Sequence, residues 1–445
     1  MINTSPGSHL RSTIVDIGLT FCRQFLTGLI QLALVLIVTH LLGAEGAGGY
    51  AVALLLPTFM GQLFNLGLGT ASIFFVASGQ FSLEVAWAAT RNAILGMTVF
   101  GIVFGASLLS TVSDQLFPGI SISVLSIGLA IYPSLLIVTI ISSFLQAVQD
   151  FRAFNITVLV QPFSSFIGVL SVWSIGSVSL VSVILIVSAA HFLSMVVAIF
   201  ILNKKVDIFV RSDGKKAYMR KAVIYGYKSY LSNILSFLSY RLDLFLLNIL
   251  IGPSAVGVYS IAVRLVEQLW MISQAVSIVI FPRLSAMNDD EELRAKFTAF
   301  MSRIVLWTTL VSAVLLAVLS RPLIALLFGL EFMAAYYALL VLLPGVVLFS
   351  CARVLANDLA ARGRVGINLA LAGLVITVNA IANILLIPFY GIVGAAMATS
   401  LSYIINLLVR LVLQNFSAEV SLREFLLPMP EDFAKVKKLL IRRTR

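Results

Sequence analysis

Two neighbouring apolar runs near the middle of the chain carry four charged side chains. Arg241 and Asp243 lie within the run 225–252, and Arg264 and Glu267 lie in the run that follows after a short turn. A charge at the centre of a bilayer costs about 2.5–3.5 kcal/mol on insertion scales, so such residues usually mark a pathway or a binding cavity. We therefore expect them to serve transport across a membrane.

The depths of these four side chains predict how they pair. With a helix rise of about 1.5 Å per residue, Asp243 and Arg264 lie roughly 14 and 15 Å from the turn at 252–254, and Arg241 and Glu267 lie roughly 16 and 20 Å from it. Residues two apart on one helix point to different faces, so we expect the cross-helix pairs Asp243–Arg264 and Arg241–Glu267. Two interpretations remain open: the pairs only fix the helix hairpin, or at least one arginine faces a hydrated cavity.

Three further cations lie deeper, toward the cytoplasmic end of their spans. Arg23, Lys228 and Arg353 would form a basic entrance, which suits an anionic cargo better than a cationic one. Asp16 precedes Arg23 by seven residues on the same helix face and is its expected partner, whereas the alternative for Lys228 is to extend to the inner interface. His191 is either a hydrogen-bonded structural residue or a proton-coupling site. The candidate anion-binding residues are Arg23, Lys228, Arg241, Arg264 and Arg353, and the candidate charge-balancing or coupling residues are Asp16, Asp243, Glu267, Asp358 and His191.

The composition is that of a membrane protein. Of the 445 residues, 60% are hydrophobic and 11% are charged, and the mean hydropathy is +1.06. The apolar runs are continuous and do not alternate, which predicts helices and not barrel strands. At about 20 residues per crossing, we expect an all-α polytopic membrane protein with about twelve transmembrane helices. The predicted spans are 13–42, 48–76, 87–112, 120–147, 154–175, 179–203, 223–251, 255–281, 298–320, 335–360, 366–388 and 392–415.

The positions of Lys and Arg predict the orientation of these spans. Most of them fall in the loops on the N-terminal side, in the segment 204–221 or in the C-terminal tail, whereas Arg321 is alone on the opposite side. Cytoplasmic loops carry such an excess, so both termini are expected in the cytoplasm. The net charge of +11 then reflects topology and anionic lipid headgroups, and nucleic acid is not expected as a partner.

The chain divides into two similar halves. We expect an N-terminal six-helix bundle over 1–203, a basic cytoplasmic linker over 204–222, a C-terminal six-helix bundle over 223–415, and a basic amphipathic tail over 416–445. With six spans per half, the halves would be parallel repeats about an axis along the membrane normal. The repeat is visible in the sequence, because Gly43, Gly48 and Tyr50 recur with the same spacing as Gly252, Gly257 and Tyr259.

The sequence carries little that predicts catalysis. There is no nucleotide-binding Walker loop and no His, Cys and Asp constellation with metal-ligand spacing, so we expect no enzyme, no cofactor and no bound metal. The acidic cluster 288–292 is best explained as the start of a helix. A carboxylate site of a membrane glycosyltransferase is the alternative, and replacement of Asp289 and Asp290 would test it.

Several motifs resemble those of one transporter family. In the hairpin they are Tyr227-x2-Tyr230-x-Ser232, Ser239-Tyr240-Arg241-x-Asp243, Val256-Gly257-x-Tyr259 and Phe281-Pro282-Arg283. Elsewhere they are Leu41-Leu42-Gly43-Ala44-Glu45-Gly46-x-Gly48-x-Tyr50 and Ile387-Pro388-x-Tyr390-Gly391-x2-Gly394-Ala395-Ala396. The chain thereby resembles the Wzx-type polysaccharide flippases, whose superfamily (the multidrug/oligosaccharidyl-lipid/polysaccharide exporters) includes the multidrug antiporters and the lipid II flippase.

The resemblance implies a fold and a function. It implies a V of two six-helix bundles (a MATE-like shape) in the bacterial cytoplasmic membrane, with alternating access coupled to an ion gradient of H⁺ or Na⁺. The implied cargo is an undecaprenyl-diphosphate-linked oligosaccharide for O-antigen, capsule or exopolysaccharide assembly. A polysaccharide polymerase and chain-length machinery are the implied protein partners. The rivals are a cation-coupled multidrug antiporter of the same fold and a non-transporting scaffold of a glycan-synthesis complex.

Overall fold

The described structure is helical throughout. Nine helices of the described residues are long and apolar enough to cross a membrane, which confirms the all-α polytopic fold. Two of these, Cys22–Phe64 and Gly366–Leu413, have 43 and 48 residues, about twice the 20 that one crossing needs. The total of twelve crossings stays a prediction. The computed structural model describes residues 6–176, 178–271, 273–274, 276–277, 284, 291–362, 364–415 and 425–427, so most of the predicted tail lies outside it.

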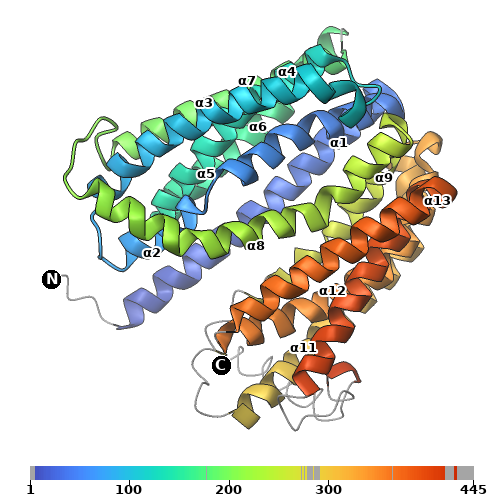
Figure 1. The fold of residues 1–445 in the computed structure, drawn as a ribbon. Coiled ribbons are helices and arrows are strands. Elements are labelled where there is room, and N and C mark those ends of the chain that lie inside the picture. Colours follow the sequence, from blue (N-terminus) through green and yellow to red (C-terminus); the bar gives the residue numbers. More distant parts are fainter. Residues whose placement is uncertain are drawn as a thin grey trace. The chain divides into compact units, whose positions relative to one another are not determined.

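The chain forms two compact units, Met1–Val258 and Tyr259–Arg445. Figure 1 draws the first unit in blue to green and the second in yellow to red. The first contains α1 (Pro6–Phe64), α2 (Leu68–Ala77), α3 (Leu83–Leu116), α4 (Ile122–Leu129), α5 (Ile131–Ala147), α6 (Phe151–Ile175), α7 (Leu180–Asn203), α8 (Lys215–Leu250) and the start of α9 (Pro253–Glu267). The second contains the rest of α9, then α11 (Glu291–Leu327), the 3₁₀ turn η1 (Leu330–Phe332), α12 (Ala334–Ala361) and α13 (Val365–Asn415).

Helix α8 begins earlier than the sequence predicts. It starts at Lys215, inside the predicted linker 204–222, after Gly214 in the left-handed region at φ 86°. Only residues 204–214 connect α7 to α8, and the carbonyl oxygen of Ile208 in this connection accepts hydrogen bonds from Trp87 Nε1 at 3.1 Å and Arg91 Nη1 at 2.7 Å. Helix α8 packs on α1, α2 and α3, so it belongs to the first unit. The predicted division of the chain into two repeated six-helix halves, 1–203 and 223–415, is not tested by this packing and stays a prediction.

Glycine breaks two of the long helices where the sequence predicts the end of a span. Gly43 in α1 has φ 63°, and Gly391 in α13 has φ 56°. Residues with a side chain rarely adopt this conformation, so the backbone can bend there without the strain of a Cβ atom. The predicted span 48–76 is not one continuous helix. Helix α1 ends at Phe64, and α2 begins after Gly67, whose φ is 69°.

The glycines of the sequence repeat contact each other within the first unit. A Cβ atom on Gly48 would overlap the carbonyl oxygen of Pro253, and a Cβ atom on Gly257 would overlap the carbonyl oxygen of Ala44. The two positions thus allow the backbones of α1 and α9 to approach closely, as small residues do between membrane helices. Gly48 and Gly257, which occupy equivalent positions of the sequence repeat, therefore also pack against each other.

The connection between α5 and α6 carries an ion pair. Asp150 caps α6 by accepting a hydrogen bond from Ala153 N at 3.0 Å, and its carboxylate lies 2.7 Å from Lys205 Nζ. The hydrogen bond from Lys205, followed by that from Ala153, holds the pKa of Asp150 below its usual value. A pKa that is lower in the folded than in the unfolded state stabilises the protein at a pH above the pKa of the unfolded chain, about 3.9. This stabilisation is lost as the pH falls through the lower pKa of the folded state.

Asp150→Asn should consequently lower stability at neutral pH and change little in acid. Asparagine keeps the helix cap, so the variant isolates the charge, and for a partly exposed pair we expect a loss of about 0.2–1 kcal/mol. Thermal unfolding in detergent between pH 7 and pH 3 measures it. Lys205→Gln should give the same loss with no further loss in the double variant. A difference between wild type and Asp150→Asn that persists unchanged at pH 3 would contradict the assignment.

Candidate functional site

Arg23 lies on α1 against an aromatic ring. Its guanidinium carbon is 5.3 Å from the centroid of Phe154, and its Nε is buried without a hydrogen-bond partner among the described residues. An arginine over an aromatic face is stabilised by the ring quadrupole, and its N–H edge stays available to an anion. The side chain of Asp16 lies outside the described residues, so the predicted Asp16–Arg23 pair stays a prediction.

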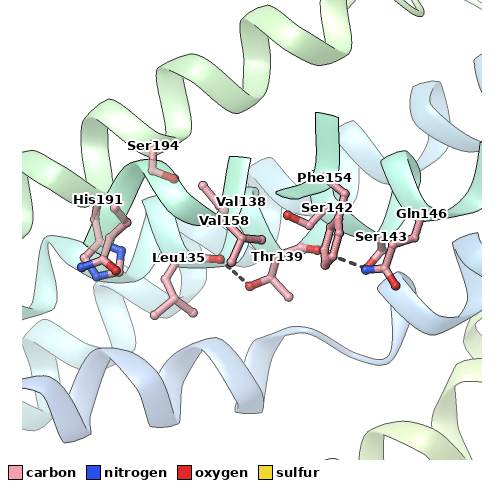
Figure 2. Close-up of a pocket in the computed structure, with 11 residues that line it drawn as sticks. Leu135, Val138, Thr139, Ser142, Ser143, Gln146, Phe154, Val158, His191 and Ser194 are labelled. Atoms are coloured by element: carbon pink, nitrogen blue, oxygen red, sulfur yellow. Dashed lines mark hydrogen bonds between the residues drawn. The ribbon is translucent and has the colours of Figure 1, made fainter. Parts of the chain in front are cut away.

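The ring of Phe154, on which Arg23 lies, also forms part of the wall of a cavity of about 350 Å³. Figure 2 shows the residues that line this cavity. Three helices surround it, and seven of its eleven lining residues have a polar side chain. Its wall also contains His191 of α7, which sequence analysis left open between a structural and a coupling role. The polar lining residues are Thr139, Ser142, Ser143 and Gln146 of α5, Gln161 of α6, and His191 and Ser194 of α7.

Arg241 and Asp243 lie on α8 and point to different environments. The Arg241 side chain is half-buried, and its Nη1 lies 3.4 Å from the carbonyl oxygen of Tyr240. Asp243 is buried, and its Oδ1 accepts a hydrogen bond from the Leu244 backbone N at 2.8 Å. Lys228 lies on the same helix, but its side chain is outside the described residues.

The other halves of the predicted pairs lie on α9 in the second unit. Arg264 and Glu267 are both half-buried. The pairs Asp243–Arg264 and Arg241–Glu267 would join the two units, whose relative positions are not determined, so they stay predictions.

In the second unit, Arg353 of α12 is held by aromatic rings. Its guanidinium carbon lies 5.5 Å from the ring centroid of Trp270 and 5.4 Å from that of Phe349. Tyr403 extends the cluster, because its ring stacks on Phe349 with centroids 4.4 Å apart. Within the described part of the chain no carboxylate forms an ion pair with Arg353 or Arg23. In each unit, therefore, one of the candidate arginines, Arg23 or Arg353, has its guanidinium held against aromatic rings.

Asp358, by contrast, belongs to an ionic network of the second unit. It is fully buried, and its carboxylate lies 3.5 Å from Arg294 Nε and 2.8 Å from Arg362 Nη2. Glu291 joins the same two arginines, at 3.3 Å from Arg294 and 2.9 Å from Arg362. Thr298 donates a further hydrogen bond to Asp358 at 3.4 Å. These contacts connect the first turns of α11 to the end of α12, and Asp358 balances the charges of Arg294 and Arg362 there.

Sequence analysis missed several of these residues. It assigned Arg294 and Arg362 to cytoplasmic loops, although both side chains are almost fully buried. It also missed the polar face of α5, which a helical spacing could have revealed, because positions 139, 142, 143 and 146 lie on one side of an apolar helix. Among the described residues, no group of His, Cys, Asp and Glu could hold a metal ion.

The arrangement of helices is found in solved transporter structures. The lipid II flippase MurJ in its inward closed conformation superposes with a TM-score of 0.74 over 91% of this chain and 88% of that chain, at 17% identity. An inward-facing multidrug resistance transporter of the MATE family has a TM-score of 0.66 over 88% of this chain and 94% of its own, also at 17% identity. The protein thus has the fold that these membrane transporters share, as the resemblance implied.

The sequence identifies the family. Residues 37–337 match the family described as polysaccharide biosynthesis protein, and the chain belongs to this family. A relative from Haloferax volcanii, named as the low-salt glycan biosynthesis flippase Agl15, is 29% identical over 43% of this chain. A relative from Shigella flexneri, named as an O-antigen transporter, is 24% identical over 57% of this chain. The alignments span 42% and 62% of the lengths of these two relatives.

Proposed function

We propose that this multi-pass membrane protein is a flippase for an undecaprenyl-diphosphate-linked oligosaccharide. It would move this lipid from the cytoplasmic to the outer leaflet of the bacterial cytoplasmic membrane, for the assembly of a surface polysaccharide. Membership of the polysaccharide biosynthesis family supports the glycan cargo, and the names of the relatives support transport and not catalysis. Both termini would be cytoplasmic, and a gradient of H⁺ or Na⁺ would drive the cycle. A polysaccharide polymerase and chain-length machinery would be the protein partners.

The observation that carries the proposal is the environment of Arg23 and Arg353. Each guanidinium lies in a membrane-spanning helix, next to aromatic rings and without an ion-paired carboxylate in the described part of the chain. A cation at such a position is costly unless an anion compensates it, which the diphosphate of the cargo would do. Arginine also suits phosphate because its planar fork donates two parallel hydrogen bonds. A cationic drug would gain nothing from these two side chains.

Arg23→Ala and Arg353→Ala should each lower export of the glycan at least tenfold. A hydrogen bond to a charged group contributes about 1.5–3 kcal/mol, which corresponds to roughly tenfold or more in affinity. The measurement is surface polysaccharide in cells that depend on this protein, with the amount of inserted protein determined by immunoblot. Arg241→Ala and Arg264→Ala, the remaining arginine candidates, are expected to lose export as well.

Arg321→Ala is the matched control, because Arg321 is an exposed arginine near the end of α11. It should export normally. Unchanged polysaccharide in both Arg23→Ala and Arg353→Ala would contradict the role of these arginines. Efflux of cationic dyes without glycan export would favour the multidrug antiporter instead.

A further inference from the structure

The cavity in the first unit lies within three helices and has a consistent chemical character. It is lined by one face of α5, by Phe154, Val158 and Gln161 of α6, and by His191 and Ser194 of α7 (Figure 2). Its volume of about 350 Å³ is near the lower limit for small-molecule sites, which run from roughly 300 to 1,000 Å³. It would accept a single sugar ring, and an oligosaccharide chain would not fit.

The lining favours an uncharged and hydroxyl-rich ligand. None of the lining residues is Asp, Glu, Lys or Arg, and His191 is the one titratable side chain among them. Thr139, Ser143 and Ser194 donate their hydroxyl protons to backbone carbonyl groups, at 2.7, 3.1 and 3.1 Å. Their oxygen lone pairs can therefore accept hydrogen bonds from a ligand. A metal ion or an organic cation would find no carboxylate here.

Ser142 gives an independent indication of a polar ligand. Its residue is 6% exposed, and its hydroxyl oxygen is buried without a hydrogen-bond partner among the described residues, although it lines the cavity. Buried hydroxyl groups are nearly always hydrogen-bonded, so a polar ligand that displaced this part of the wall would supply the partner that Ser142 lacks.

Phe154 connects this cavity to the candidate phosphate-binding arginine. The ring lines the cavity, and the guanidinium of Arg23 lies 5.3 Å from its centroid. Because Phe154 contacts both, a diphosphate bound at Arg23 would hold its own glycosyl residue close to this wall of the cavity. The C–H face of a pyranose can pack on an aromatic ring, while its hydroxyl groups reach the serine, threonine and glutamine side chains.

We propose that the cavity between α5, α6 and α7 is a subsite for an uncharged sugar, the residue directly attached to the diphosphate. This inference rests on the proposed function, because it assumes a glycosyl diphosphate as cargo. It adds that the first unit recognises the first sugar and that Arg23 lies at the junction between sugar and phosphate. The selectivity of the protein for its glycan would then depend in part on α5.

Saturation-transfer NMR on the full-length protein in nanodiscs tests the subsite. The probes are neutral methyl glycosides of glucose, galactose and N-acetylglucosamine, with inorganic diphosphate as the anionic probe. At least one glycoside should receive saturation from the wild-type protein. Ser142→Leu, which fills the cavity, should weaken its binding at least tenfold, and Gln161→Ala should weaken it several-fold without filling the cavity.

Ser171→Leu is the matched control, because Ser171 is an exposed serine of α6 that donates to its own helix at Ile167 O. It should bind the glycoside as the wild type does. Arg23→Gln should keep glycoside binding and weaken diphosphate binding, since Arg353 remains. The subsite is refuted if no glycoside receives saturation from the wild type. It is also refuted if Ser142→Leu and Gln161→Ala, folded as judged by thermal unfolding, bind the glycoside unchanged.

These outcomes separate the subsite from the proposed function. If the Ser142→Leu and Gln161→Ala variants lose glycoside binding while Arg353→Ala exports normally, the subsite stands and the phosphate role of Arg353 is wrong. If both variants bind the glycoside unchanged while Arg353→Ala abolishes export, the flippase proposal stands and the subsite is wrong.

Discussion

Asp358→Asn is expected to lower the free energy of unfolding by about 3–5 kcal/mol, the usual cost of removing one partner from a buried ion pair. The carboxylate of Asp358 is fully buried and within ion-pair distance of both Arg294 and Arg362, whose side chains are 6% and 4% exposed. An amide cannot balance these two cations. Unfolding in detergent, followed by helix content against denaturant, measures the loss, and the yield of inserted protein should fall with it.

Two variants distinguish this network from a general defect. Glu291→Gln removes the other carboxylate, which is 59% exposed, so its loss should stay within about 1 kcal/mol because water already screens it. Replacing Asp358 by Leu together with Arg294 and Arg362 by Met removes all three buried charges and should recover much of the stability. If Asp358→Asn unfolds at the wild-type denaturant concentration, the network does not stabilise the second unit.

Gly257→Val is expected to prevent close packing of α1 and α9 and thereby to abolish export. A Cβ atom at this position would overlap the backbone oxygen of Ala44, and a backbone atom cannot move aside as a flexible side chain can. Overpacking a close contact typically costs about 1–3 kcal/mol, and two added methyl groups should bring this variant to the upper end. Gly48→Val, at the equivalent position of the sequence repeat, should behave alike. Polysaccharide export and thermal unfolding of the purified protein measure both effects.

Gly96→Ala is the matched control for the glycine variants. Gly96 lies in α3, and an added Cβ would meet no atom within 4 Å. Because alanine is the better helix former by roughly 0.5–1 kcal/mol, this variant should be as stable as the wild type or more stable. If Gly257→Val exported normally and were as stable as the wild type, the close contact of Gly257 with Ala44 would be needed neither for folding nor for export.

The sequence by itself determined the class of the fold and many of the helix boundaries. Continuous apolar runs predict membrane helices because the length of a run and the cost of a charge within it are local properties of the chain. The breaks at Gly43 and Gly391 were likewise predictable, since a left-handed backbone conformation requires a particular residue type. The start of α8 at Lys215 was not, because a basic segment reads as a loop unless its packing on α2 and α3 is known.

Only the tertiary structure decided which polar groups meet. Arg294 and Asp358 are far apart in the sequence, and nothing in their spacing predicts that α11 and α12 bring them together. The cavity needs faces of three helices, and Phe154, which no motif of the sequence singles out, both lines it and contacts Arg23. The physical reason is that an apolar run by itself is enough to form a membrane helix. The rotation of that helix about its axis and the helices next to it depend on packing among all helices of the unit.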